Sequence, residues 1–157
     1  QVIRLRNDKL REGIKQKDKE LANSTMQTLQ KNEMLITLRD ELKKLAGFSQ
    51  DERHKHEVSH LVRKINKEID NEKQWKIFET QFEKVHEEFM TRVKLAFPNL
   101  TPRELKLCAY LRMNISSKEM SVLMNISTRG VEISRYRLRK KLELPRETNL
   151  TEFIMSF

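Results

Sequence analysis

The sequence contains few residues that interrupt regular backbone structure. Only three glycines and three prolines occur in 157 residues, whereas a turn-rich β fold needs many such residues. Apolar residues make up 37% of the chain and charged residues 35%. That is little core material for one compact globule and is typical of helices that each bury one stripe. The sequence therefore predicts an all-α protein.

Cysteine and long apolar runs are also scarce. The single Cys108 cannot form an internal disulfide and lies in an apolar stretch, so we expect a small core residue in a reducing compartment. No run approaches the roughly 20 apolar residues of a membrane helix, and no signal peptide is visible. Because the chain begins at Gln1 and not at methionine, we expect it to be a piece of a longer protein.

The positive charge is concentrated near the C-terminal end. The formal net charge is +9, and residues 100–147 hold 11 Lys and Arg against 5 Asp and Glu. A local surplus of this kind favours a polyanionic partner.

Residues 1–47 are predicted to form one long coiled-coil helix. A heptad register runs from residue 2 to residue 46 without interruption. Its a positions are Asn7, Ile14, Leu21, Thr28, Leu35 and Leu42, and its d positions are Ile3, Leu10, Lys17, Ser24, Lys31, Leu38 and Leu45. The pattern indicates either a parallel homodimer through residues 3–45 or a local bundle with the next segment. We expect a left-handed cap at Gly47 to end the helix.

Residues 48–97 are predicted to form a helical hairpin that couples the two ends of the chain. The spacing of Ser49 and Glu52 is that of a capping box, and a helix over about 50–69 follows. A second helix, over about 72–95, carries large apolar residues at helical spacing, which indicates packing. These are Trp75, Phe78, Phe82, Val85, Phe89 and Val93.

Residues 98–157 are predicted to form a helix-turn-helix domain. Thr101-Pro-Arg-Glu104 is a strong helix start, and Ser116, Ser127 and Asn149 are candidate caps for three further helices. The helix over about 128–142 is basic and follows a short helix and a three-residue turn. This is the layout of a domain that reads double-stranded DNA.

The basic helix supplies the candidate DNA-binding residues. If Val131 and Leu138 are buried, the outward face comprises Glu132, Ile133, Tyr136, Arg137 and Lys140. We expect phosphate contacts from Lys118, Thr128, Arg129, Arg135, Arg137, Arg139, Lys140 and Lys141.

Several anchors in this part resemble the LuxR/GerE-type helix-turn-helix. They are Leu100-Thr-Pro-Arg-Glu104, Ser117-Lys-Glu-Met120, Asn125-Ile-Ser127, Val131 and Lys141-Leu142. Gly130 and Ser134 depart from the family pattern, which usually has Thr and often His at these positions. The resemblance implies that Glu132, Ile133 and Tyr136 reach base edges.

A broader resemblance extends upstream of this domain. Residues 19–33, the aromatic series from Trp75 to Phe89 and the run Leu107-Cys-Ala-Tyr-Leu-Arg112 look like the cytoplasmic part of SusR-like sensor regulators. Such proteins place a β-propeller and a triple-tyrosine domain outside the membrane. The resemblance implies a cytoplasmic output segment of an inner-membrane-anchored protein.

Other functions remain as alternatives. The chain could be a coiled-coil interaction or signal-relay module, or a sigma-factor-like helix-turn-helix that acts only with polymerase. The segment around His60 vaguely resembles the phosphoacceptor histidine helix of sensor kinases. A kinase would also need a glycine-rich nucleotide-binding domain, and the three scattered glycines of this sequence cannot form one. His54 and His56 lie about 200° apart on a helix and cannot share a metal ion. We therefore expect no enzyme, catalytic residue, metal, cofactor or small-molecule substrate in this segment.

Overall fold

The computed structural model describes residues 2–157, except for the side chains of Ile14 and Lys15. Gln1 and the side chain of Ile14, an a position of the heptad register, therefore lie outside the described residues. Every regular element among them is a helix, so the all-α prediction is confirmed. The helices are α1 (Val2–Phe48), α2 (Glu52–Ile69), α3 (Glu72–Val85), α4 (Phe89–Ala96), α5 (Pro102–Arg112), α6 (Ser117–Leu123), α7 (Thr128–Lys141) and α8 (Leu150–Ser156).

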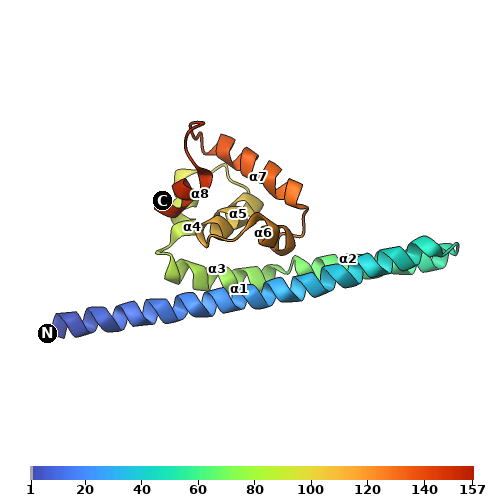
Figure 1. Cartoon of the computed structure of the whole chain (residues 1–157), viewed down its shortest axis with the longest axis horizontal. Coiled ribbons are helices and arrows are strands. Elements are labelled where there is room, and N and C mark those ends of the chain that lie inside the picture. The colour runs from blue at the N-terminus through green and yellow to red at the C-terminus, as the bar shows by residue number, and fades with distance from the viewer. Residues whose placement is uncertain (1) are drawn as a thin grey trace.

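The long helix α1 and its neighbour α2 form an antiparallel hairpin, which we call the arm (residues 2–69). Figure 1 shows α1 running the length of the molecule, with α2 returning along it. The compact group formed by α5–α8, which we call the head (residues 100–157), lies on one side of the arm. Helix α1 contacts α2, α3 and α6 of its own chain. This arrangement corresponds to the local-bundle alternative.

The buried face of α1 explains this arrangement. Leu21, Thr25, Leu29 and Asn32 are all buried, and their spacing of four, four and three residues places them on one side of the helix. Leu21 and Leu29 belong to the same buried cluster as the residues of the head. Before Leu21, the side chains of Val2, Ile3, Leu5 and Leu10 are exposed, and Ile3 is 77% accessible.

Two predicted helix boundaries in the arm were wrong. Helix α1 continues to Phe48, and Gly47 does not adopt the positive φ of a left-handed cap. The N-cap of α2 is Asp51, whose side chain accepts a hydrogen bond from the backbone N–H of Arg53. Ser49 instead accepts from the backbone N–H of Asp51, so it supports the turn before the cap.

The predicted helix over 72–95 is two helices. Helix α3 ends at Val85 and α4 begins at Phe89, with Glu87 and Glu88 at φ of 51° and 58° between them. Glu83 caps the second helix from a distance, because its carboxylate accepts from the backbone N–H of Met90 at 2.7 Å. Apolar residues continue at helical spacing on both sides of the break, so both helices place apolar side chains in the core.

The head is built around α5. Leu105, Cys108, Ala109 and Leu111 are buried as predicted, and they pack against Val131, Leu138 and Leu142. The predicted caps Thr101, Ser116, Ser127 and Asn149 each accept a backbone hydrogen bond at a helix start. Local sequence signals therefore fix the start of every helix in the head.

Candidate nucleic-acid interface

The turn between α6 and α7 is closed by backbone and side-chain hydrogen bonds. Asn125 adopts a φ of 53°. The backbone N–H of Ile126 donates to the Ser121 carbonyl at 3.0 Å, and that of Asn125 donates to the Val122 carbonyl at 3.2 Å. This pair of bonds is a Schellman closure of α6. Ser127 then begins α7, so the direction of α7 is set within three residues.

Gly130, which departs from the family pattern, does not prevent capping of α7. Its backbone N–H donates to the hydroxyl of Ser127 at 3.0 Å. A Cβ at this position would lie 3.3 Å from that hydroxyl and 3.4 Å from the Cβ of Ile126. The first contact is tighter than usual and the second is at the edge of ordinary van der Waals contact, so glycine lets the turn pack closely on the first turn of α7.

The three predicted base-reading residues lie on the open face of α7. Glu132 is exposed, Ile133 is 44% accessible and Tyr136 is 60% accessible. Val131 and Leu138 are fully buried on the opposite face. In Figure 1, α7 lies on the side of the head that faces away from α1. The arm therefore leaves this face uncovered.

Three of the predicted phosphate-binding cations are bonded within the head. Arg135 donates to the hydroxyl of Thr151 at 3.2 Å, and Arg139 donates to the carbonyls of Pro145 and Thr148. Lys141 forms an ion pair with Glu104 at 2.9 Å. These bonds join α7 to α5, α8 and the loop between α7 and α8. Their partners all lie outside α7, so helical periodicity within α7 could not predict these contacts.

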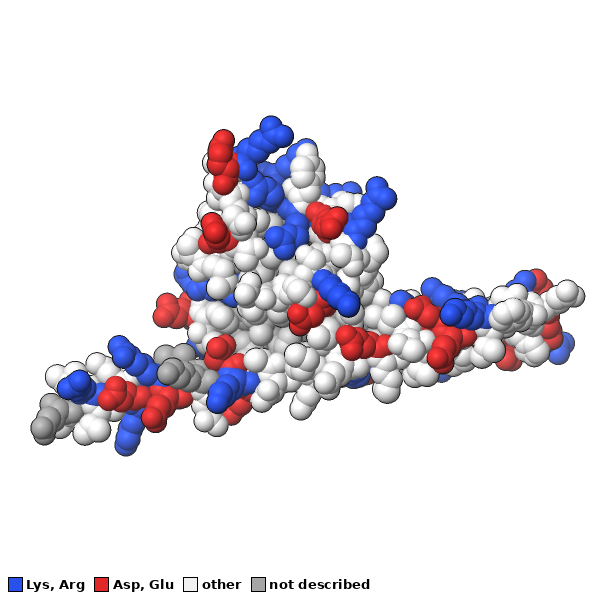
Figure 2. All heavy atoms as spheres, viewed as in Figure 1, with Lys and Arg blue, Asp and Glu red and all other residues white. Residues whose placement is uncertain are grey.

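The remaining predicted phosphate-binding residues lie at the surface. Lys118, Thr128, Arg129, Arg137 and Lys140 are all exposed. The ammonium of Lys140 lies 4.7 Å from the centroid of the Tyr136 ring, a distance at which a cation and an aromatic face attract. Figure 2 shows Lys and Arg gathered over the part of the head where α7 lies in Figure 1. The open face thus places three base-reading candidates among positive charges.

The residues considered for metal or catalytic chemistry do not form a site among the described residues. No group of three or more His, Cys, Asp or Glu side chains is close enough to hold an ion there. His54 is exposed and lies near Ser49 and Asp51, and His60 is exposed on α2. Burial raises the pKa of the Cys108 thiol to about 12, which makes it a poor nucleophile.

A short helix, a tight turn and a basic helix with an open face define a helix-turn-helix DNA-binding domain. Residues 98–154 match the family model described as bacterial regulatory proteins, luxR family. Residues 98–154 are therefore a LuxR-type helix-turn-helix domain, the kind of domain with which DNA-binding transcription regulators bind DNA, and that family of domains is not an enzyme family. Searches of curated proteins and of solved structures found no match to the chain.

Proposed function

We propose that the protein is a sequence-specific, dimeric transcriptional regulator whose activity is set through its arm. The observation that supports it most is the open face of α7 in a LuxR-type domain. Glu132, Ile133 and Tyr136 project from that face and are flanked by the exposed cations Arg137 and Lys140. Such a face fits the major groove, with base contacts at its centre and phosphates at its edges.

Each residue of the open face has a chemical role in this proposal. The Glu132 carboxylate accepts a hydrogen bond from a cytosine amino group, and Ile133 contacts a thymine methyl. Tyr136 reaches a base edge beside Lys140, whose ammonium lies against its ring. Arg137 and Lys140 neutralise phosphates. Lys118, at the N-terminal end of α6, and Thr128 and Arg129, at the N-terminal end of α7, also contact phosphates.

The proposed homodimer forms through the exposed parts of α1 within residues 3–45. Ile3 and Leu10 are 77% and 61% accessible and occupy successive d positions, and Leu38 and Leu45 are also exposed. Own-chain packing buries the a position Leu21 and half-buries the a positions Leu35 and Leu42, whereas these four d positions stay exposed. The heptad residues that remain exposed can therefore pair with a second α1.

The chain is proposed to act as the output part of a larger sensor protein. In this proposal, residues 1–47 dimerise, residues 48–97 couple and residues 98–157 bind DNA. The origin from an inner-membrane-anchored, SusR-like sensor, with this segment on the cytoplasmic side, rests on the sequence resemblance. None of the described helices combines the length and apolar character needed to cross a bilayer.

The test is selection of duplex DNA from a random pool, followed by mass measurement of free and bound protein. We expect a two-fold symmetric site bound by two copies of the chain. Glu132→Gln should change the selected bases, whereas Arg137→Met should weaken binding to all sequences. Absence of any binding to free duplex would refute the proposal and favour a domain that acts only with polymerase or a relay module.

A further inference from the structure

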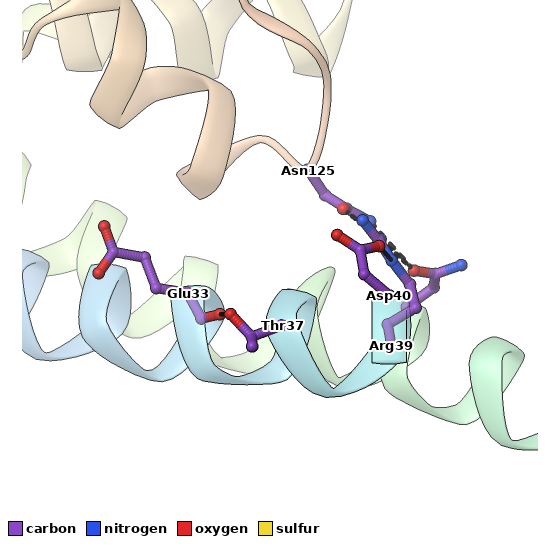
Figure 3. Close-up of polar contacts among 6 residues, drawn as sticks. Glu33, Thr37, Arg39, Asp40 and Asn125 are labelled. Carbon is purple, nitrogen blue, oxygen red and sulfur yellow. Dashed lines mark hydrogen bonds and ion pairs between the residues drawn. The ribbon is translucent and has the colours of Figure 1, made fainter. Parts of the chain in front are cut away.

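Arm and head are joined by a small polar cluster, which Figure 3 shows. The Nη1 atom of Arg39, on α1, donates to the Oδ1 atom of Asn125 at 2.6 Å and to the Oδ1 atom of Asn66 at 2.8 Å. The Nδ2 atom of Asn125 donates to the same Asn66 oxygen at 3.3 Å. One guanidinium nitrogen therefore ties α1, α2 and the turn of the helix-turn-helix together. We call these three residues the latch.

Asn125 has two separable roles in this cluster. Its backbone has positive φ and closes α6, a conformation that asparagine and glycine tolerate best. Its side chain is half-buried and points toward the arm, as Figure 3 shows. A left-handed turn does not require that amide, so its contact with Arg39 is an additional feature.

The rest of the arm–head interface is imperfectly packed. A hollow of about 300 Å³ lies between α1, the start of α3, α5 and α6. Beside it, the side chain of Asn32 is 1% exposed, and neither its Nδ2 nor its Oδ1 has a hydrogen-bond partner. A buried amide without partners opposes docking. The Nε atom of Arg39 is also buried without a hydrogen-bond partner and lies 3.6 Å from the Asp40 carboxylate, so the two hydrogen bonds of Nη1 are what joins Arg39 to α2 and to the head.

We propose that the latch fixes the orientation of the head on the arm, and that Arg39 is a positioning residue for DNA binding. Because Arg39 bonds to Asn66 of α2 and to Asn125 of the turn, a slide of α1 along its neighbours changes the geometry of both bonds together. The turn that they hold leads to Ser127, the cap of α7. A movement of Arg39 with the arm is thus transmitted to α7 through Asn125 and Ser127. The link to regulation rests on the proposed function.

The test measures opening of the interface by thiol labelling of the full chain without DNA. Asn32→Cys places a reporter thiol at a buried interface position, and the native Cys108 reports unfolding of the head. In this background, Arg39→Met removes the donor at similar length. Asn125→Gly removes the amide but keeps a residue suited to positive φ. Glu41→Gln, at an exposed position of α1, is the matched control.

We expect Arg39→Met and Asn125→Gly each to raise the labelling rate at the introduced thiol by roughly tenfold, as loss of a charged hydrogen bond implies. The variant with both substitutions should label only slightly faster than either single variant, because both substitutions remove the hydrogen bond between Arg39 and Asn125. The Cys108 rate should not change. Asn125→Asp should slow labelling of the introduced thiol when Arg39 is present, but not when it is combined with Arg39→Met. Unchanged labelling in both single variants, or parallel acceleration at Cys108, would overturn the latch.

A second measurement tests the positioning role separately. On duplexes with two half-sites at varied spacing, Arg39→Met should flatten the spacing preference and leave binding to one half-site intact. A latch confirmed by labelling but without effect on spacing would overturn the positioning role. If the native chain binds no duplex, the proposed function fails, and the labelling result stands independently.

Discussion

Lys141 and Arg137 lie one helical turn apart on α7, and the structure predicts different consequences for their removal. Lys141 pairs with Glu104 at 2.9 Å. The same carboxylate accepts from the backbone N–H of Thr101 at 2.9 Å, which completes the capping box of α5. Arg137 is exposed. We therefore expect Lys141→Met to affect stability and Arg137→Met to affect DNA binding.

The magnitudes separate the two variants. The side chains of Lys141 and Glu104 are 38% and 16% exposed, so solvent screening limits the pair to about 1 kcal/mol. For a chain of this size, that loss lowers Tm by roughly 2–4 °C. Arg137→Met should change the free energy of unfolding by less than about 0.5 kcal/mol. It should reduce the slope of log affinity against log salt by about 0.9, the contribution of one phosphate contact.

The assay combines thermal unfolding with DNA titrations at four or more salt concentrations. Glu104→Gln with and without Lys141→Met completes a double-mutant cycle, and a coupling close to zero would contradict the ion pair. A salt slope reduced by Lys141→Met, at unchanged stability, would refute the division of the cations into internal and DNA-facing groups. The same comparison applies to Arg135 and Arg139, which are also bonded within the head.

Four further predictions concern the open face, the exposed part of α1, the cap of α7 and the buried core. Glu132→Gln should alter the bases selected at one position of the site while the salt slope stays the same, as sequencing of selected DNA will show. Ile3→Glu together with Leu10→Glu should convert a dimer to a monomer by mass measurement, with an unchanged circular dichroism melt of the head. Ser127→Ala should cost about 1 kcal/mol of stability, and Ser127→Gly only a few tenths; equal losses would contradict the capping role. Phe82→Ala, which empties a fully buried position, should cost roughly 3–5 kcal/mol in denaturant unfolding.

The head could be predicted from the sequence in detail because its signals are local. Each helix start has its own cap residue, and Thr101 and Glu104 even form the reciprocal capping box. The outward position of Glu132 followed from helical periodicity alone. These features depend on residues within about two helical turns of each other, and tertiary packing does not alter them.

The arm was harder to predict because its determinants are distant or have no sequence signature. The heptad register fits a second copy as well as α2, and only packing against helices distant in sequence decides that Leu21 and Leu29 face inward. The break at Glu87 and Glu88 requires positive φ at two residues that seldom adopt it. Their apolar neighbours keep the same period on both sides, so nothing in the sequence indicated the break.

The placement of the arm bears on the regulation proposed above, because it separates two surfaces of the head. Helix α6 packs against α1, whereas α7 carries its open face on the far side of the head (Figure 1). Docking of the arm and binding of DNA therefore do not compete for one surface. The turn between α6 and α7 is joined both to the arm and to the DNA-binding helix. Asn125 bonds to Arg39 of the arm, and Ser127 caps α7. Regulation by a change in head orientation fits this geometry better than regulation by covering the DNA-binding face.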